Sequence, residues 1–250
     1  GIRSFSVEPK GATFELTDSH KFIWSILGTD VDFAPDGSLY VTDWVNGWVG
    51  EGKGRLYRFA DQENISAVAG ANVPQLLNGG VAKSDTEELF TLLSHADRRI
   101  RQMAQFELVK RELREELFAA VKAASGDTVA QRHLAWALWQ LGLKSADDAK
   151  RVIEFCAAGG IKSAEDLGVQ YIKIMTDLIK RHGISDAMTA ETRSTLQDEL
   201  VSLTKSRELR EAGFAAVALG AIGTGSDTAI LLELLERNDN KDPVLRHQAV

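Results

Sequence analysis

The second part of the chain repeats one short pattern at the start of its helical segments. The pattern is a helix-capping residue, an aliphatic residue at +3, an arginine at +4 and a small residue at +7. Its two complete copies carry the cap and the arginine at Asp97 and Arg101 and at Asp242 and Arg246. The cap satisfies free backbone N–H groups, the aliphatic residue packs inward, and the small residue lets a second helix approach. Each copy therefore predicts a helix that stacks on another.

Three less exact copies lie between these two. Two of them have their cap and arginine at Asp127 with Arg132, after one extra residue, and at Ser206 with Arg210. The third, near residues 165–172, has lost the arginine. The copies are 30 to 41 residues apart, which is typical of two-helix solenoid repeats. We expect each arginine to meet the cap carboxylate of an adjoining repeat. The pattern resembles the HEAT-repeat signature over about residues 82–250, which implies an α-solenoid of antiparallel helix pairs with right-handed stacking.

The first sixty residues follow a different period. Apolar and polar residues alternate over short segments, as in half-buried strands, and predict three to six strands between residues 4 and 59. Asp36 and Gly37 supply the turn of a tight hairpin between Phe33 and Leu39. Near residue 80, Gly and aromatic residues give way to Leu, Ala, Glu and Arg. The predicted fold is mainly α: a small antiparallel β segment at 1–60, a linker at 61–82 and a helical solenoid at 83–250.

The stretch from Thr29 to Phe59 carries closely spaced Asp, Gly and Trp residues. These motif residues are Asp32, Asp36, Gly37, Asp43, Trp44, Trp48, Gly52, Lys53, Gly54 and Arg55. The stretch resembles the last blade of the sugar-dehydrogenase-like β-propellers, in particular those of the membrane-bound dehydrogenase family. Members of that family continue into HEAT-like helices, as this chain does, and many end in a cytochrome c domain.

This resemblance implies an exported, periplasmic bacterial oxidoreductase that takes electrons from a sugar or alcohol, with quinone and haem c as cofactors of the parent protein. No Cys-x-x-Cys-His motif occurs in these residues, and the resemblance assigns them no catalytic, cofactor-binding or metal-binding residue. It implies instead a junction and scaffold, whose helical repeats position a haem domain or a protein partner. Whether the chain is itself an enzyme stays open. The alternative is a non-catalytic HEAT-repeat scaffold for protein interaction.

Charge and cysteine content narrow the choice of partner. Lys and Arg number 29 against 36 Asp and Glu, a net charge of −7, whereas proteins that bind nucleic acid typically carry a basic excess. We therefore expect protein partners, or neighbouring domains of the same chain, and no nucleic acid. Cys156 is the only cysteine, which excludes an intrachain disulfide. No apolar run is long enough to span a membrane, and the chain is expected to be an internal part of a longer protein.

Motifs that suggest small-ligand chemistry fit poorly. The glycine-rich stretch from Gly47 to Lys53 is followed by Gly54, where a phosphate-binding loop needs Ser or Thr, and it leads into a strand rather than a helix. The aspartates within residues 30–36 do not keep EF-hand spacing, and turn chemistry is the favoured interpretation. The five histidines lack the close spacing of a metal site.

Two helical features have both a functional and a structural interpretation. Basic residues at 98–114 are interleaved with glutamates, which predicts a solvated, ion-paired helix face. Trp136 and Trp139 share one side of a helix, where they form either a binding ridge or part of the solenoid core, and we favour the core. Cys156, in an apolar run, is expected to act as a small core residue.

The β segment is expected to pack its apolar face on the first helices. Trp44, Trp48, Tyr57 and Phe59 are the predicted contacts, bridged by the apolar residues of the linker, Val68, Val73, Leu76 and Leu77. The reason is that an isolated sheet would leave an edge unpaired. Pairing with a second copy at that edge is the alternative.

Overall fold

The computed structural model describes residues 1–45, 52–123, 128–162, 166–183 and 188–250. These residues are mainly helical, with a small antiparallel β segment towards the N-terminus, as the sequence predicts. The strands are β1 (Ile2–Lys10), β2 (Thr13–Ile23), β3 (Gly28–Phe33), β4 (Leu39–Asp43) and β5 (Arg55–Phe59). Strands β1 and β2 form a two-stranded ribbon, and the other strands form an antiparallel sheet in the order β3-β4-β5.

The helices follow the strands along the chain. The α-helices are α1 (Gln62–Gly70), α2 (Val73–Gln75), α3 (Thr86–Leu92), α4 (Arg98–Lys110), α5 (Arg114–Ala123), α6 (Val129–Gly142), α7 (Ala146–Ala157), α8 (Asp166–His182), α10 (Ala190–Leu203), α11 (Leu209–Ile222), α12 (Thr228–Asn238) and α13 (Pro243–Gln248). Short helical turns are η1 (Leu76–Gly80), η2 (Val81–Lys83), η3 (Gly160–Lys162) and η4 (Gly225–Asp227). None of the described helices is both long and apolar enough to cross a lipid bilayer.

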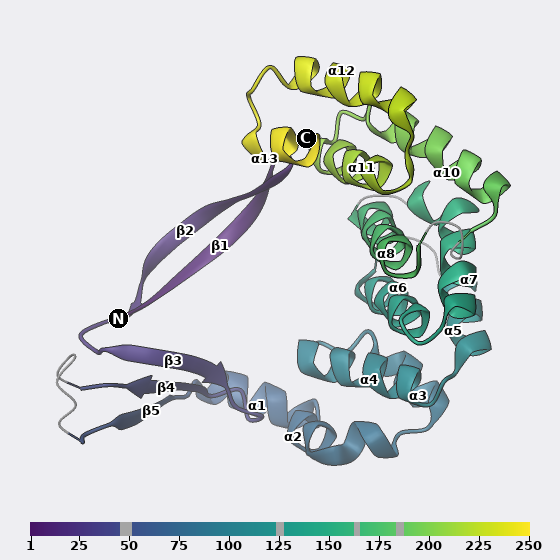
Figure 1. Cartoon of the computed structure of the whole chain (residues 1–250). Helices are drawn as coiled ribbons and strands as arrows, with labels where there is room; N and C mark the ends of the chain where they lie inside the picture. The colour runs from purple at the N-terminus through teal and green to yellow at the C-terminus, as the bar shows by residue number, and fades with distance from the viewer. Residues whose placement is uncertain (46–51, 124–127, 163–165, 184–187) are drawn as a thin grey trace.

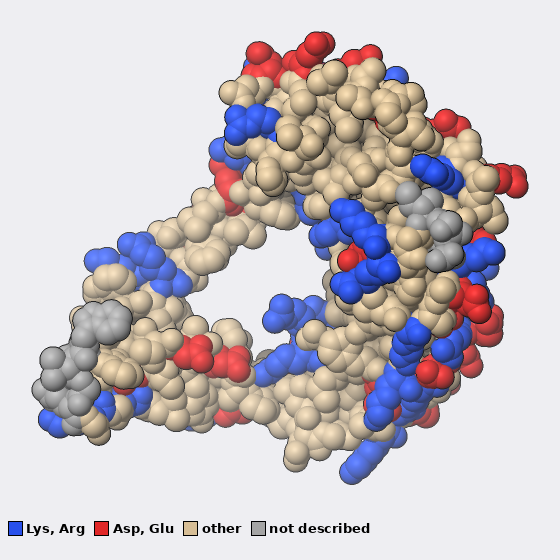
Figure 2. All heavy atoms as spheres, in the orientation of Figure 1, with Lys and Arg blue, Asp and Glu red and all other residues tan. Residues whose placement is uncertain are grey.

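From α3 onwards the helices form two layers along an arc (Figure 1). Helices α4, α6, α8, α11 and α13 contact one another in succession and make the inner layer, while α3, α5, α7, α10 and α12 lie outside them. The β1–β2 ribbon runs from the sheet at one end of the arc to α13 at the other. The molecule is therefore a ring, and a central opening is visible in the space-filling view (Figure 2).

The main core runs continuously through the helical arc. Its buried side chains extend from Val73 to Ile222, and a smaller cluster joins Ala12 of the ribbon to α11, α12 and α13. Helix α7 shows how the sequence produces this core: Ala149, Val152, Ile153 and Cys156 recur at helical spacing and are all buried. The prediction that Cys156 is a core residue is confirmed. Its burial raises the pKa of the thiol, so the thiolate is disfavoured.

The predicted hairpin joins β3 to β4. Phe33 pairs with Leu39, and Gly37 in the turn has a φ of 82°, a conformation that glycine adopts without strain. The Asp36 carboxylate accepts a hydrogen bond from the Ser38 backbone N–H at 2.9 Å. It also forms an ion pair with Arg58 at 2.9 Å. These bonds lower the pKa of Asp36 to about 2. The aspartate is thus a turn residue, as the sequence predicts.

The sheet contacts the helices, but the predicted contacts are confirmed at most in part, because Tyr57 is half-buried whereas two others are exposed. Trp44 is 49% exposed and Phe59 is 38% exposed, so neither is covered by helices, and Trp48 lies outside the described residues. A contact that the sequence did not predict is made by Arg99 of α4, which donates to the backbone oxygens of Phe33 and Ala34 at 2.8 and 3.1 Å. The prediction was therefore wrong for Trp44 and Phe59, and a polar contact with main-chain oxygens at the end of β3 joins the sheet to α4.

The segment predicted to be a linker, 61–82, contains α1, α2 and η1. Val73 and Leu76 are buried in the main core, and Val68 and Leu77 pack against it. Val68 also lies directly beside Gly37 of the β3–β4 turn. The four apolar residues therefore bridge the β and helical parts, as expected, but they do so from helices.

Candidate functional site: the groove between α4 and α6

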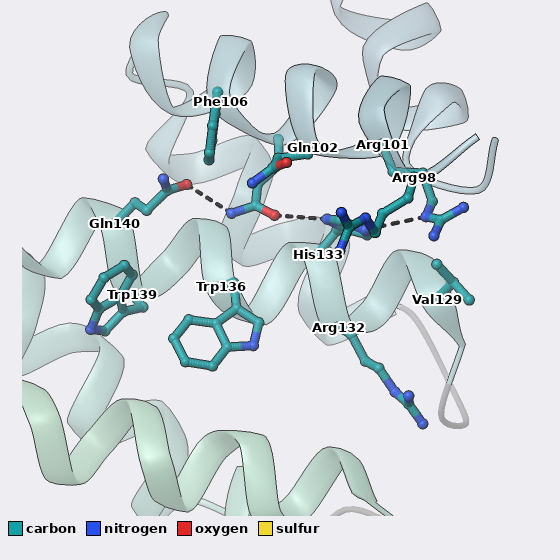
Figure 3. Close-up of a pocket in the computed structure, with 11 residues that line it drawn as sticks. Arg98, Arg101, Gln102, Phe106, Val129, Arg132, His133, Trp136, Trp139 and Gln140 are labelled. Atoms are coloured by element: carbon teal, nitrogen blue, oxygen red, sulfur yellow. Dashed lines mark hydrogen bonds between the residues drawn. The ribbon is translucent and has the colours of Figure 1, made fainter. Parts of the chain in front are cut away.

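A groove lies between α4 and α6 on the inner layer, away from α3 and α5 (Figures 1 and 3). Its volume is about 500 Å³. The lining residues are Arg98, Arg101, Gln102, Gln105, Phe106, Val129, Arg132, His133, Trp136, Trp139 and Gln140. We call this the α4–α6 groove. The side chains that project into it come from successive turns of the two helices, because residues three and four apart share one face.

The groove is basic in an acidic chain. Arg98, Arg101 and Arg132 line it, and no Asp or Glu is among its described lining residues. Arg98 is exposed and makes no ion pair with any residue in the described part of the chain. Figure 2 shows Lys and Arg side chains gathered along the border of the central opening beside these helices. The charge of Arg98 is therefore available to an external anion.

A chain of hydrogen bonds holds the floor of the groove in place (Figure 3). The Nε of Arg101 donates to Nε2 of His133 at 3.3 Å, so the proton of the neutral imidazole is on Nδ1. Nδ1 donates to the side-chain oxygen of Gln105 at 2.7 Å, and the Gln105 amide donates to Gln140 at 2.8 Å. Burial, together with the charge of Arg101, lowers the pKa of His133. The imidazole is thus neutral near pH 7, and its orientation is set.

The guanidinium of Arg101 is positioned by the main chain rather than by a carboxylate. Its Nη1 donates to the backbone oxygens of His95 and Ala96 at 2.7 and 2.8 Å. Those oxygens belong to the connection between α3 and α4, so the side chain is tied to the start of its own helix. Backbone oxygens orient the guanidinium without neutralising its charge.

The aromatic side of the groove is formed by Phe106 with Trp136 and Trp139. Phe106 is 47% exposed, and the two tryptophans are half-buried with their rings edge to face at 5.3 Å. Their indole N–H groups donate to Gln170 and Asp177 of α8, at 3.3 and 2.7 Å. The favoured interpretation is thus confirmed in part, because the tryptophans pack against the core, and they also line the groove.

Two of the four predicted caps of the repeat pattern are confirmed. Asp97 accepts from the backbone N–H of Arg99 at 2.8 Å, and Asp242 accepts from Val244 and Leu245 at 2.9 Å. Asp127 lies outside the described residues, and the residue that caps α6 is Thr128. Ser206 is not a cap, because α11 begins after Glu208. At α6 and α11 the N-cap is therefore a polar residue one or two positions after the one that the sequence predicts.

The repeat arginines have diverse partners, so the prediction that each meets a neighbouring cap carboxylate was too simple. Arg210 does pair with an adjoining repeat, through Asp166 at the start of α8 at 3.0 Å. Arg246 instead donates to Asn240 in its own loop, and Arg101 donates to backbone oxygens and His133. Arg132 lines the α4–α6 groove.

The blade-motif residues gather around strand β4 and its flanking loops. Asp43 is buried and accepts from the backbone N–H groups of Leu27 and Val45 at 2.9 and 3.1 Å, which lower its pKa. Asp32 accepts from the next residue's backbone N–H at 2.8 Å. The remaining motif residues with described positions lie in the β4–β5 connection or at its end: Gly52, Lys53, Gly54 and Arg55, the last donating to the Tyr57 hydroxyl at 3.2 Å. These contacts are structural, and they form no pocket with the groove.

Comparison with family models, curated proteins and solved structures found no match for this chain. The resemblance to the membrane-bound dehydrogenase family therefore stays a prediction that depends on residues 29–59. Within the described ranges, no three His, Cys, Asp or Glu side chains lie close enough to hold a metal ion.

The α4–α6 groove was not predicted from the sequence. The sequence feature that could have revealed the groove is the spacing of Arg98, Gln102 and Phe106 at i, i+4 and i+8, which places them on one helix face.

Proposed function

We propose that this chain is a protein-interaction scaffold of the α-solenoid type, whose α4–α6 groove binds an acidic segment of a partner protein. The observation that carries the proposal is the charge of the groove: Arg98 and Arg101 line it without a carboxylate partner in the described part of the chain, whose net charge is −7. Support for the solenoid comes from the two layers of successive helices and from the repeated pattern that begins at Asp97.

A peptide segment fits the groove because its lining offers three kinds of contact. Arg101 presents a guanidinium held by backbone oxygens and Arg98 an exposed one, and both suit carboxylates. Phe106 and Trp136 present apolar surface beside them, and Gln102 presents an exposed amide that suits a peptide backbone. Aromatic and arginine side chains together are typical of the energetic centre of protein interfaces. An alternating acidic and apolar sequence uses all three contacts.

The proposal is tested with a short fluorescein-labelled synthetic peptide of alternating Asp, Glu, Phe and Leu residues. Fluorescence anisotropy should show saturable binding that weakens as salt rises, because the contacts are ionic. Arg98→Glu should weaken binding about tenfold or more, since it places a like charge in the groove. Arg98 is exposed, so the variant should fold.

Two controls decide the outcome. Lys180→Glu makes the same charge change at an exposed position of α8 outside the groove, and it should leave binding unchanged. A peptide with Asn and Gln in place of the acids should bind much more weakly. Equal loss in both charge variants would mean that net charge alone attracts the peptide, and the groove would then not be the site. A labelled pyrophosphate that binds the groove while the peptide does not would contradict the protein partner.

A second candidate is the junction role in a quinone- or haem-linked dehydrogenase, in which the occupant of the inner face is a haem domain or a neighbouring domain. It is favoured by the β3-β4-β5 meander, because propeller blades are antiparallel meanders of this kind. A sugar-oxidation assay with added quinone and an artificial acceptor separates the two. The scaffold proposal expects no turnover by the chain alone, and turnover abolished by a substitution within this chain would favour the oxidoreductase.

A further inference from the structure

A second basic pocket lies where the β1–β2 ribbon meets the C-terminal helices, and it is independent of the α4–α6 groove. Its volume is about 480 Å³. It is enclosed by the end of β1, the α10–α11 connection and the α12–α13 connection. The cations that line it are Lys10, Lys205, Arg207, Arg237 and Lys241, and its remaining described lining residues are Ser206, Leu209, Asn238, Asp242 and Leu245.

The single carboxylate of this pocket is already engaged. Asp242 accepts from the backbone N–H groups of Val244 and Leu245 at the start of α13, and from that of Ala12 in the ribbon at 2.8 Å. These hydrogen bonds lower its pKa against the opposing effect of burial. Asp242 is therefore occupied with the backbone and does not neutralise the cations around it.

The cations keep an excess of positive charge. Lys10 pairs with Glu15 at 2.6 Å and Lys241 with Asp239 at 3.2 Å, both at the exposed rim. Arg237 donates to the backbone oxygen of Thr204, which leaves its charge uncompensated. The side chains of Lys205 and Arg207 are exposed and make no ion pair or hydrogen bond with the part of the chain that is described. Three positive charges thus face this pocket without a carboxylate partner.

We propose that this pocket binds a phosphate-type oxyanion, which fastens the ribbon to the helices. The planar guanidinium of arginine donates two parallel hydrogen bonds, and the ammonium of lysine acts as a point charge. Both kinds of donor recognise phosphate oxygens. The pocket has a size that suits a small molecule, and no aromatic residue is among its described lining residues, so it offers no stacking surface for a base. A compact anion with more than one phosphate is the ligand that matches several separated cations.

The ligand would join two distant parts of the sequence. Lys10 comes from the ribbon, whereas Arg207 and Arg237 come from the helical arc. The ribbon tip already rests on the helices through the Ala12 hydrogen bond to Asp242 and through the Arg210 guanidinium, which lies 4.6 Å from the centre of the Phe14 ring. An anion that contacts Lys10 and Arg207 together adds a third contact and stabilises the closed ring.

Isothermal titration of the whole chain with inorganic pyrophosphate tests this proposal. Binding should be saturable, weaken with salt, and drop about tenfold or more in Arg207→Glu. Lys180→Glu, with the same charge change at an exposed position elsewhere, should bind as the unsubstituted chain does. Equal pyrophosphate binding by Arg207→Glu would overturn the site, and so would a chain that binds neither pyrophosphate nor vesicles that contain phosphatidic acid.

Two further measurements separate the parts of the proposal. Vesicles of phosphatidylcholine with phosphatidic acid test a lipid source: binding to these vesicles that is lost in Arg207→Glu, without pyrophosphate binding, assigns the same site to a phosphate headgroup. Hydrogen exchange of residues 10–14 tests the fastening role. Pyrophosphate should slow this exchange, and Lys10→Gln should remove the effect. Unchanged exchange in the bound protein would show that the anion does not hold the ribbon.

Discussion

The two ends of helix α4 are both rich in arginine and lysine, yet their charges are used differently. At the C-terminal end, Lys110 and Arg111 pair with Glu107 at 3.3 and 3.0 Å. At the N-terminal end, Arg98 and Arg101 line the α4–α6 groove and have no carboxylate partner in the described part of the chain. The interleaved sequence predicts an ion-paired face along the whole stretch, which is confirmed at the C-terminal end and for Arg99, paired with Asp97 at 2.7 Å, but not for Arg98 and Arg101. A neighbouring carboxylate must lie on the same face, not merely nearby in sequence, to neutralise a cation.

Among the ion-paired residues near the C-terminal end of α4, removal of a buried carboxylate should lower the free energy of unfolding the most. Arg114, at the start of α5, donates to both oxygens of Asp148 at 3.1 Å, and the Asp148 carboxylate also accepts from the hydroxyl of Ser145, the N-cap of α7. Asp148 is buried. Asp148→Ala should lower the free energy of unfolding by about 2 kcal/mol, because several charge-assisted hydrogen bonds are lost together. Urea denaturation followed by circular dichroism measures the effect.

Asp147→Ala is the matched control for that experiment. Asp147 is exposed in the same first turn of α7, so both substitutions remove the same favourable interaction with the helix dipole. The control should cost a few tenths of a kcal/mol. Equal losses would show that the pairing with Arg114 adds nothing to stability.

At the groove end, Arg101 should matter for stability and Arg98 should not. Arg101→Met removes the hydrogen bonds to His95, Ala96 and His133, and it should lower the free energy of unfolding by about 1 to 2 kcal/mol. Arg98→Met should have no measurable effect, because Arg98 is exposed and makes no ion pair in the described structure. Parallel urea titrations compare the two variants. A similar loss of stability in both would show that the hydrogen bonds of Arg101 do not distinguish it from the exposed Arg98.

Within the paired end, burial should separate Arg111 from Lys110. Arg111→Met should cost about 0.5 to 1 kcal/mol, since its side chain is largely covered and also donates to the backbone oxygen of Ala82 at 3.1 Å. Lys110 is highly exposed, and Lys110→Met should leave stability unchanged. Thermal unfolding at low and high salt measures both. A loss for Lys110→Met as large as that for Arg111→Met would mean that charge and not burial sets the contribution.

The smallest effect is expected from acidification of the groove. The folded protein holds the pKa of His133 below its ordinary value of 6.5, through burial and the charge of Arg101. As the pH falls below 6.5, the unfolded chain takes up this proton more readily than the folded one, so stability declines. His133→Gln should reduce this decline between pH 7 and 5, whereas His20→Gln, at an exposed site on the ribbon, should not. Identical pH profiles for all three proteins would show that His133 is not desolvated in the fold.

The sequence by itself determined the local structure of this protein. Alternation of apolar residues predicted the strands, Asp36 with Gly37 predicted the β3–β4 turn, and Asp97 and Asp242 were recognised as helix caps. All of these depend on contacts within a few residues, where backbone geometry and nearby donors decide the outcome. Their residue types therefore carry the information directly.

Only the tertiary structure decided which of the chain's charges stay free. Arg98 and Arg111 lie in the same basic stretch, but one faces a groove without carboxylates and the other lies beside Glu107. Likewise, the sheet docks through Arg99 and the main-chain oxygens of Phe33 and Ala34, a contact between residues more than sixty positions apart. Such contacts depend on how helices and strands are placed around the ring. Because the strength of an ion pair depends on distance and solvent exposure, residue type alone does not determine it.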